Sequence, residues 1–574
     1  MLRIEIGLVT LALVVALLRP SWGSCLFDNL ECIFARLAQR RALAVVVVGL
    51  ATLALRAALL PILPVPEPIV HDEFGYLLAA DTFTHGRIAN PTHPMWIHFE
   101  TFHVMFHPTY ASIYPPAQGL LLAVGKILTG NPFLAVWLSI GLMCASITWM
   151  LQGWMPTEWA LFGGVIAILR YGVFGYWANS YWGGEVAAIG GALVLGALPR
   201  MQNLKRRRDA IAMGAGLGIL ANSRPYEGLI FSIPILVILV KSLFGKQGSP
   251  LRVSLPRVVL PLAAVLVLSA IATGYYLWRV TGSPFRMPYQ IERRNYAVAP
   301  YMIWQHVRPE PVYHHAAMRK MFVEEEMLGL TVFRSPIGLL LRLYLAWSFY
   351  LGPVLTLPML MLAVTLPRDF SCHDVSRPTV NLLVIFAISF LGSVLVNFYS
   401  PHYSAPDTGL LIAMVLISTQ QLRKWAKPGL WLTRSIALIC ILSFALRAAA
   451  GPLRIPLHEY SAFAWHEKAA TSFGRYEIQR QLSHRSGKHL VIVHYKPDHE
   501  PFAEWVYNDA DIDHSNVVWA REMDPVQNQQ LLNYYYDRHA WLLEADEKPP
   551  RLLPYADKMT AAVSVNGTSN SASQ

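Results

Sequence analysis

The sequence contains little charge for its length. Only 14% of its 574 residues are Asp, Glu, Lys or Arg, whereas 54% are hydrophobic. An ordinary soluble domain carries about 25% charged residues, and a disordered chain carries few apolar ones. The low charge argues against a soluble domain, and the high apolar content excludes a disordered chain. A mean hydropathy of +0.37 indicates a polytopic α-helical membrane protein.

Cysteine is also scarce, with five residues in the whole chain. All of them fall in expected cytoplasmic loops or within apolar segments, which gives no disulfide framework. These residues are Cys25, Cys32, Cys144, Cys372 and Cys440.

The net charge of +11 raises the question of a nucleic-acid partner. The basic residues, however, gather in short loops between apolar segments and not on one soluble domain. Positively charged short loops stay in the cytoplasm, so the orientation of the protein in the membrane explains these basic residues. No nucleic-acid partner is therefore expected. The groups that set the orientation are Arg36 with Arg40 and Arg41, residues 205–208, residues 241–257, and Arg423 with Lys424 and Lys427.

All of these basic loops fall on the cytoplasmic side only if residues 115–128 form a helix that lies on the outer surface and does not cross the membrane. The N-terminal segment 4–18 is interpreted as an additional membrane segment, because no cleavage site of a signal peptide follows it. The expected total is about eleven or twelve transmembrane helices. The expected spans are 42–63, 132–152, 157–172, 183–199, 209–223, 228–244, 258–278, 337–364, 380–397, 405–420 and 430–449.

The domain organisation follows from this topology. Segments 489–495, 516–520 and 539–543 have the pattern of strands, which predicts a small α/β domain on the outer side. The Ser, Asn and Ala bias near the end predicts disorder. The expected parts are 1–41, an N-terminal membrane segment and cytoplasmic loop; 42–450, a transmembrane catalytic domain with outer loops 64–131 and 279–336; 451–559, the extracytoplasmic α/β domain; and 560–574, a disordered tail.

Carboxylates stand at the outer end of span 42–63. The sequence there reads His-Asp-Glu-Phe-Gly-Tyr over residues 71–76, and Tyr114-Pro115-Pro116 follows later in the same loop. Ionisable residues beside a bilayer usually belong to a functional site. Asp72 and Glu73 are therefore candidate catalytic residues.

The acidic pair, the later Pro-Pro and the arrangement of spans over residues 42–450 resemble the GT-C membrane glycosyltransferases, in particular the protein O-mannosyltransferases and the lipid A aminoarabinose transferases. The resemblance implies inverting transfer of a sugar from a polyprenyl-phosphate carrier to a lipid, glycan or protein acceptor on the outer face. Asp72 matches the family's catalytic aspartate, which accepts the acceptor's proton, and Glu73 would orient it.

The anionic phosphate of such a donor requires hydrogen-bond donors or positive charge. Arg224, between two spans, is the first candidate, and its alternative role is to cap a helix while paired with Glu227. His402 and Tyr403 stand at the outer mouth of a later span, where an interfacial role is an equal alternative.

Two further residues are candidates for the phosphate. Tyr76 matches a tyrosine of the aminoarabinose transferases, although a buried structural tyrosine is equally consistent with its position. Those transferases often carry Lys or His immediately before the Pro pair, where this chain has Tyr114. Arg87 is the candidate replacement for that charge, and an exposed loop arginine is the default interpretation.

Six histidines in the first outer loop raise the question of a metal. Their spacing fits no closed zinc pattern, so we assign no metal ligand and expect interfacial hydrogen-bond donors. The alternative is a divalent cation that touches Asp72 or Glu73. The histidines are His71, His85, His93, His98, His103 and His107.

A transporter or lipid flippase is the alternative function, because it also needs many spans and a few charges. It has less support, since no internal repeat is evident and the polar residues gather in outer loops and not at the midplane. The expected location is the inner membrane of a Gram-negative bacterium, with the active site on the periplasmic face.

Overall fold

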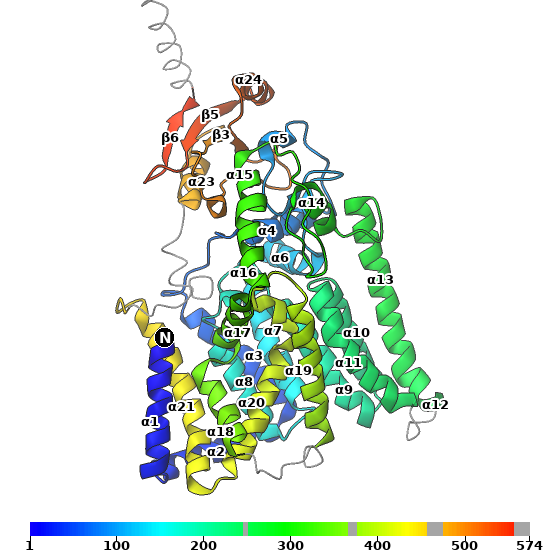
Figure 1. The fold of residues 1–574 in the computed structure, drawn as a ribbon, viewed down its shortest axis with the longest axis vertical. Helices are drawn as coiled ribbons and strands as arrows, with labels where there is room; N and C mark the ends of the chain where they lie inside the picture. Colours follow the sequence, from blue (N-terminus) through cyan, green and yellow to red (C-terminus); the bar gives the residue numbers. More distant parts are fainter. Residues whose placement is uncertain (245–250, 366–375, 456–473, 556–574) are drawn as a thin grey trace, which may run out of the picture.

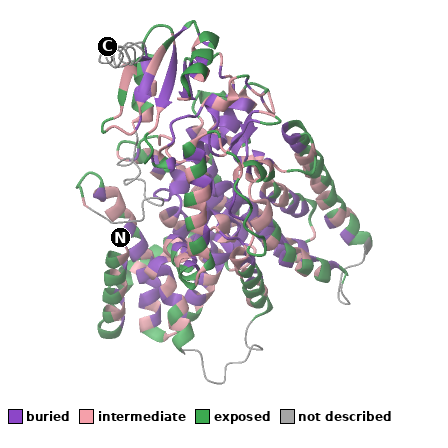
Figure 2. Ribbon diagram, turned by 45° about the horizontal axis from the view of Figure 1, so that its top comes forward, coloured by how far each residue is buried: buried purple, intermediate pink, exposed green. Residues whose placement is uncertain are grey.

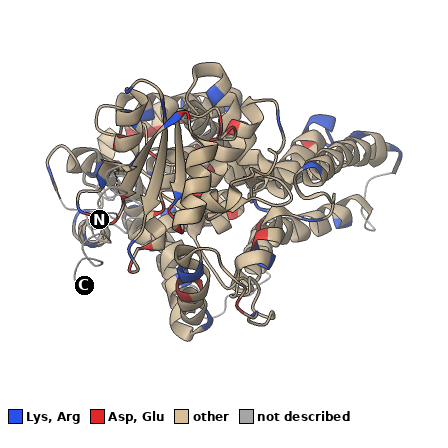
Figure 3. Cartoon of the chain, turned by 90° about the horizontal axis from the view of Figure 1, so that it is seen from above, with Lys and Arg blue, Asp and Glu red and all other residues tan. Residues whose placement is uncertain are grey.

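The computed structural model describes residues 1–244, 251–365, 376–455 and 474–555. A bundle of helices forms the lower part of the molecule, and a smaller part that includes a four-stranded sheet lies above it (Figure 1). Seen from above, most of the ribbon carries charge of neither sign, as expected from the composition (Figure 3). The predicted disordered tail, 560–574, and Cys372 lie outside the described residues.

Six helices of the bundle are long and apolar enough to cross a membrane, and a seventh crossing is obtained if one helix pair, bent by 92°, forms a single span. This confirms a polytopic helical membrane protein. The six are α3 (Arg41–Ala58), α7 (Phe133–Leu151), α11 (Pro225–Phe244), α13 with the turns before it (Arg252–Thr281), α19 (Arg377–Val394) and α21 (Ala426–Ala450).

The other bundle helices are shorter or less apolar, and they pack among and around the six (Figure 1). These are α1 (Leu2–Leu18), α2 (Ser24–Gln39), α8 (Thr157–Arg170), α9 (Glu185–Asn203), α10 (Arg207–Ala221), α17 (Pro336–Tyr350), α18 (Gly352–Thr365) and α20 (Thr408–Arg423). Three short segments complete the bundle: α12 (Leu251–Ser254), η2 (Leu255–Val259) and η1 (Tyr176–Ala178).

The expected single span 337–364 is wrong. Gly352 adopts a left-handed backbone conformation with φ of +59°, and the helix breaks there into α17 and α18. A residue without a Cβ adopts this conformation at little cost, so glycine provides the break. The apolar sequence of the segment concealed it.

Glycines allow the bundle helices to approach closely. A Cβ built on Gly141 of α7 would lie 2.7 Å from the Leu53 side chain of α3, and one on Gly216 of α10 would lie 2.7 Å from the carbonyl oxygen of Gly190 in α9. Helices in membranes associate through such small residues, because lipid offers no hydrophobic driving force between them. Buried residues fill the middle of the molecule and exposed ones lie on its outer helices (Figure 2). The helix α7 is largely buried, whereas α13, at the edge of the bundle, is almost wholly exposed.

The first outer loop folds into a layer above the bundle. It contains α4 (His71–Thr84), α5 (Trp96–Phe99), the antiparallel strands β1 (Val104–Met105) and β2 (Ala111–Ser112), and α6 (Pro116–Thr129). At 1.5 Å per residue, α6 is about 21 Å long, too short for a hydrocarbon core of about 30 Å. It packs against α4 above the bundle, in agreement with the expectation of a helix that does not cross (Figure 1).

The second outer loop contributes short helices beside this layer. They are α14 (Pro288–Tyr296), α15 (Ala316–Arg319), the π-helical turn η3 (Lys320–Glu325) and α16 (Glu326–Arg334). A further 3-10 segment, η5 (Pro401–Asp407), precedes α20.

The predicted C-terminal α/β domain is present. Its sheet has the order β4-β3-β5-β6, in which the first three strands are parallel and β6 is antiparallel. The three predicted strand segments are confirmed. The elements are α23 (Arg475–Ser483), β3 (Lys488–His494), η7 (Pro501–Ala503), β4 (Val517–Arg521), α24 (Pro525–Tyr534), β5 (Arg538–Glu544) and β6 (Arg551–Pro554).

One face of this sheet packs directly on the first outer loop. Leu490 and Ile492 of β3 share a hydrophobic core with Leu78 of α4 and Phe99 of α5. Val491, between them, faces the opposite core because side chains alternate along a strand. The C-terminal domain therefore covers the layer that carries the acidic pair.

Candidate active site

The carboxylate of Asp72 lies at the N-terminal end of α4. The phenol of Tyr114 donates a hydrogen bond to its Oδ1, and Nδ1 of His71 lies 3.1 Å from its Oδ2. The amino end of a helix carries partial positive charge, which favours an anion at this position. The carboxyl group is only 17% exposed, so water screens these interactions weakly.

A histidine from the loop after α5 completes the surroundings of Asp72. Ligand atoms of His71, Asp72 and His103 lie within 4.8 Å of one another, and the two imidazole rings are 4.5 Å apart between centroids. Among the described residues this is the group of His, Asp and Glu side chains placed to share a metal ion. His103 has a φ of +60°, which is unusual for a residue with a side chain.

The charges of this cluster interact strongly. Burial by itself raises the pKa of Asp72, but the nearby charge of His103 and the hydrogen bond from Tyr114 outweigh it and lower that pKa. Burial lowers the pKa of His103, whereas the carboxylates of Asp72 and Glu292 raise it to about 9. Asp72 is therefore an anion and His103 a cation at neutral pH.

Arg224 stands immediately before α11 with its guanidinium 4.9 Å above the ring of Tyr403. Its backbone N–H donates to the carbonyl of Leu220, but its guanidinium makes no hydrogen bond or close ion pair with a side chain that the structure describes. Glu227 interacts with the guanidinium electrostatically, and its Oε1 is buried without a hydrogen-bond partner, so the two side chains are neighbours that are not hydrogen-bonded. Arg224 retains its donors for a ligand.

Tyr76 connects the two groups. It lies one turn after Asp72 on α4, its ring stacks on Tyr114 at 4.3 Å, and it interacts electrostatically with both Asp72 and Arg224. Burial raises the pKa of Tyr76 and raises that of Tyr403 to about 12. Both phenols are therefore neutral donors at physiological pH.

His402 belongs to the same neighbourhood and is already engaged. Its Nδ1 lies 2.8 Å from the hydroxyl of Tyr176, and its ring packs 4.9 Å from that of Trp182. Burial and the charge of Arg224 lower its pKa well below the ordinary value, so the imidazole is neutral. Nε2 remains the nitrogen of His402 that could face a ligand.

Glu73 points away from the cluster. Its Oε2 accepts hydrogen bonds from the backbone N–H groups of Ile69 and Val70, at 2.9 and 3.0 Å, and its Oε1 accepts one from that of Tyr181 at 3.0 Å. These bonds satisfy the N–H groups of the N-cap residue Val70, of Ile69 before it and of Tyr181 in a separate segment. Glu73 thus caps the helix and holds the segment of Tyr181 against it.

Arg87 also lies elsewhere. Its guanidinium is 3.8 Å from Oδ2 of Asp511 in the C-terminal domain. Arg87 follows the end of α4, whereas Asp72 is at its start, so about 20 Å of helix separates them. The structure does not bring Arg87 to the cluster.

Sequence reasoning missed three contacts of Asp72 and its neighbours. Tyr114 was treated as the loss of a charge, although its hydroxyl binds Asp72 directly. His103 was one of six loop histidines, and Glu292 carried no motif. Oε1 of Glu292 accepts from the backbone N–H of His103 at 3.2 Å and lies 3.3 Å from its Nδ1, although the two residues are 189 positions apart.

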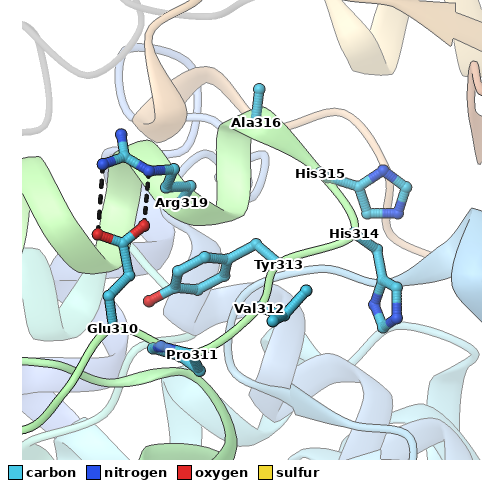
Figure 4. Close-up of a pocket in the computed structure, with 8 residues that line it drawn as sticks. All are labelled: Glu310, Pro311, Val312, Tyr313, His314, His315, Ala316 and Arg319. Carbon is cyan, nitrogen blue, oxygen red and sulfur yellow. Dashed lines mark hydrogen bonds and ion pairs between the residues drawn. The ribbon is translucent and has the colours of Figure 1, made fainter.

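Two cavities lie in the outer layer, one formed within the second outer loop and one between the first and second outer loops. One, of about 380 Å³, is shown in Figure 4, where Glu310 and Arg319 face each other at the opposite end from His314 and His315. The other, of about 230 Å³, reaches Glu292, so the partner of His103 lies in its wall. The second cavity is lined by Trp96, Glu100, Met105, Phe106, His107, Glu292, Asn295, Tyr296, Val312 and His314.

No family model and no curated protein matches the chain. Among solved structures, it is similar to ArnT from Cupriavidus metallidurans bound to undecaprenyl phosphate, with 14% identity over 86% of this chain and 92% of ArnT and a TM-score of 0.49. It is also similar to the oligosaccharyltransferase of Archaeoglobus fulgidus, with 11% identity over 88% of this chain and 69% of that one and a TM-score of 0.46.

Both TM-scores are below 0.5 and both identities are below 15%, so these similarities assign no activity to the chain. What the chain does depends on its own side chains.

Proposed function

We propose that this protein is an integral-membrane inverting glycosyltransferase that moves a sugar from a polyprenyl-phosphate carrier to an acceptor hydroxyl outside the cytoplasm. One observation supports the proposal: the carboxylate of Asp72 and the guanidinium of Arg224 both lie close enough to Tyr76 to interact with it, at the top of an apolar helical bundle. A base and an anion site so placed suit a substrate with a lipid tail and a phosphate head.

The donor phosphate is assigned to the side of the site that carries Arg224. A lipid phosphate gains negative charge as its bond to the sugar breaks, and fixed donors stabilise that charge. Arg224 supplies a charged fork, and the neutral phenols of Tyr76 and Tyr403 supply O–H donors. The polyprenyl chain would lie against the apolar helices below.

The acceptor is assigned to the side of Asp72. The acceptor oxygen attacks the anomeric carbon and gives its proton to the Asp72 carboxylate, while the bond from that carbon to the phosphate oxygen breaks with its electron pair. A single displacement inverts the anomeric centre. The phosphate is a good leaving group, so this reaction does not need the paired carboxylates of glycoside hydrolysis.

The proposed orientation places this chemistry on the outer face of the inner membrane. The basic segment 205–208 follows the lower end of α9, whereas α4 lies above the upper end of the bundle (Figure 1). Since positive loops remain in the cytoplasm, Asp72 would face the periplasm. The acceptor would be a lipid, a glycan or a protein that reaches this face.

The test is transfer by purified protein in nanodiscs, using radiolabelled polyprenyl-phosphate sugars and a membrane extract as acceptor. Wild type should move label to an acceptor, Asp72→Asn should not, and Asp511→Asn serves as the matched control because Asp511 lies in the C-terminal domain. Transfer by Asp72→Asn at the wild-type rate would refute the role of Asp72. Transport of label without transfer would favour a flippase.

A further inference from the structure

The cavity between the first and second outer loops is lined by polar groups that the fold does not use. Trp96 and His107 line it from the first loop, and Glu292 and Asn295 line it from α14. Among the described residues, the indole N–H of Trp96 and the ring of His107 form no hydrogen bond. The same holds for the Asn295 amide and for Oε2 of Glu292, whose Oε1 is the atom that contacts His103. These groups keep their hydrogen-bonding capacity for a ligand.

The mixture of donors and acceptors indicates the class of ligand. The indole N–H of Trp96 donates, Oε2 of Glu292 accepts, and the Asn295 amide does both. An ammonium group offers donors alone and leaves the indole unmatched, whereas a phosphate offers acceptors alone and is repelled by the carboxylate. A sugar ring carries several hydroxyls, each of which donates and accepts, so it matches all of these groups.

Aromatic rings form much of the remaining wall. Trp96 contacts the imidazoles of His107 and His314, whose planes stand at 85° and 86° to the indole with centroids 4.6 and 5.3 Å away. Phe106 and Tyr296 also line the cavity. Aromatic walls with a few placed polar groups are typical of small-ligand sites. The volume of about 230 Å³ lies below the roughly 300–1,000 Å³ of common ligand sites, which limits the ligand to a single ring.

Two contacts link this cavity to Asp72. Oε1 of Glu292 lies 3.3 Å from the His103 ring, and His103 offers a ligand atom within 4.8 Å of the Asp72 carboxylate. The wall near Asp72 is therefore positioned by the same residues that surround the carboxylate. Glu100, elsewhere in the wall, accepts a hydrogen bond from the Tyr296 hydroxyl at 2.5 Å, which joins the two loops across the cavity.

We propose that this cavity binds one sugar ring of the acceptor, beside the hydroxyl that gives its proton to Asp72. The acceptor is then a saccharide, either a free glycan or the headgroup of a glycolipid, and not a protein. The role as acceptor site rests on the proposed function, whereas the binding of a sugar rests on the cavity alone.

The first experiment measures sugar binding without any donor, by saturation-transfer NMR on the full chain in nanodiscs. The probes are glucose, galactose, mannose and N-acetylglucosamine, each titrated through the millimolar range. At least one should bind wild type, and Asn295→Ala and His107→Ala should each weaken its binding about fivefold, the effect of losing one hydrogen bond. Asn533→Ala is the matched control, because Asn533 is an exposed asparagine on α24 of the C-terminal domain.

Both cavity variants should fold, because Asn295 and His107 are exposed and their side chains have no hydrogen-bond partner among the described residues. Thermal unfolding of the same samples checks this. Binding of none of the four sugars, or equal binding by wild type and both variants, would overturn the proposal.

The second experiment identifies the source of the acceptor sugar from the labelled product of the transfer assay. Label that resists protease supports the proposal, and its extraction into organic solvent or retention in water distinguishes a glycolipid from a free glycan. Label released by protease as peptides would overturn the saccharide acceptor. If wild type transfers no label to any acceptor, the proposed function fails, while sugar binding at the cavity is still decided by the first experiment.

Discussion

Replacing Arg224 with Gln separates a ligand-binding arginine from a structural one. In the structure, the guanidinium of Arg224 has no hydrogen bond or close ion pair to a described side chain, contacts the ring of Tyr403 at 4.9 Å and interacts electrostatically with Glu227. Its removal therefore breaks no hydrogen-bonded pair between side chains. We expect the free energy of unfolding to fall by at most about 2 kcal/mol, the size of a desolvated cation–π contact.

The effect on the donor should be much larger. A hydrogen bond between charged groups contributes about 1.5–3 kcal/mol, which corresponds to roughly 10- to 150-fold in binding or rate. Arg224→Gln should therefore weaken capture of the polyprenyl-phosphate sugar by that factor. Arg224→Lys should recover part of the loss, because it restores the charge but not the planar fork.

The assay is steady-state transfer against donor concentration in nanodiscs, with thermal unfolding of the same samples. Arg279→Gln is the control, since Arg279 ends α13 and is exposed. A large loss of stability with unchanged donor kinetics would contradict this reasoning and return Arg224 to a structural role, because breaking a buried ion pair costs about 3–5 kcal/mol.

The remaining predictions concern Asp72's hydrogen bond, the helix cap and the C-terminal domain. Tyr114→Phe removes the O–H that binds Asp72 and keeps the ring, so kcat should fall about tenfold while the unfolding temperature stays the same; a tenfold change in donor KM alone would contradict it. Glu73→Ala leaves three N–H groups without an acceptor, and the free energy of unfolding, measured in detergent, should fall by at least about 2 kcal/mol. Arg521 pairs with the buried carboxylate of Glu504 and donates a hydrogen bond from Nε to the carbonyl of Glu100 in the first outer loop, so Arg521→Met should cost about 3–5 kcal/mol and expose the C-terminal domain to limited proteolysis; unchanged protection would count against a role of Arg521 in holding the domain on that loop.

Local patterns in the sequence were sufficient for the architecture. Apolar runs of membrane length predicted the bundle, because this signal depends on neighbouring residues alone, and the orientation inferred from the basic loops stays a prediction. The alternating pattern of residues 489–495 likewise predicted β3. The sequence did not predict the break at Gly352, because one glycine hardly changes the hydropathy of an apolar segment.

The sequence also nominated Asp72, Arg224, Tyr76 and Tyr403, which share one electrostatic neighbourhood in the structure. It could do so because an ionisable or aromatic residue at the end of a span is recognisable without knowing its partners.

Only the tertiary structure decided which residues lie around Asp72 and hold its neighbours in place. Glu73, adjacent in sequence, turns to the backbone because a helix sends successive side chains about 100° apart, and Arg87 is carried away by the length of α4. His103 and Glu292 come to the site from separate loops, 189 positions apart. Contacts of that separation arise from the packing of whole elements, so no local pattern records them.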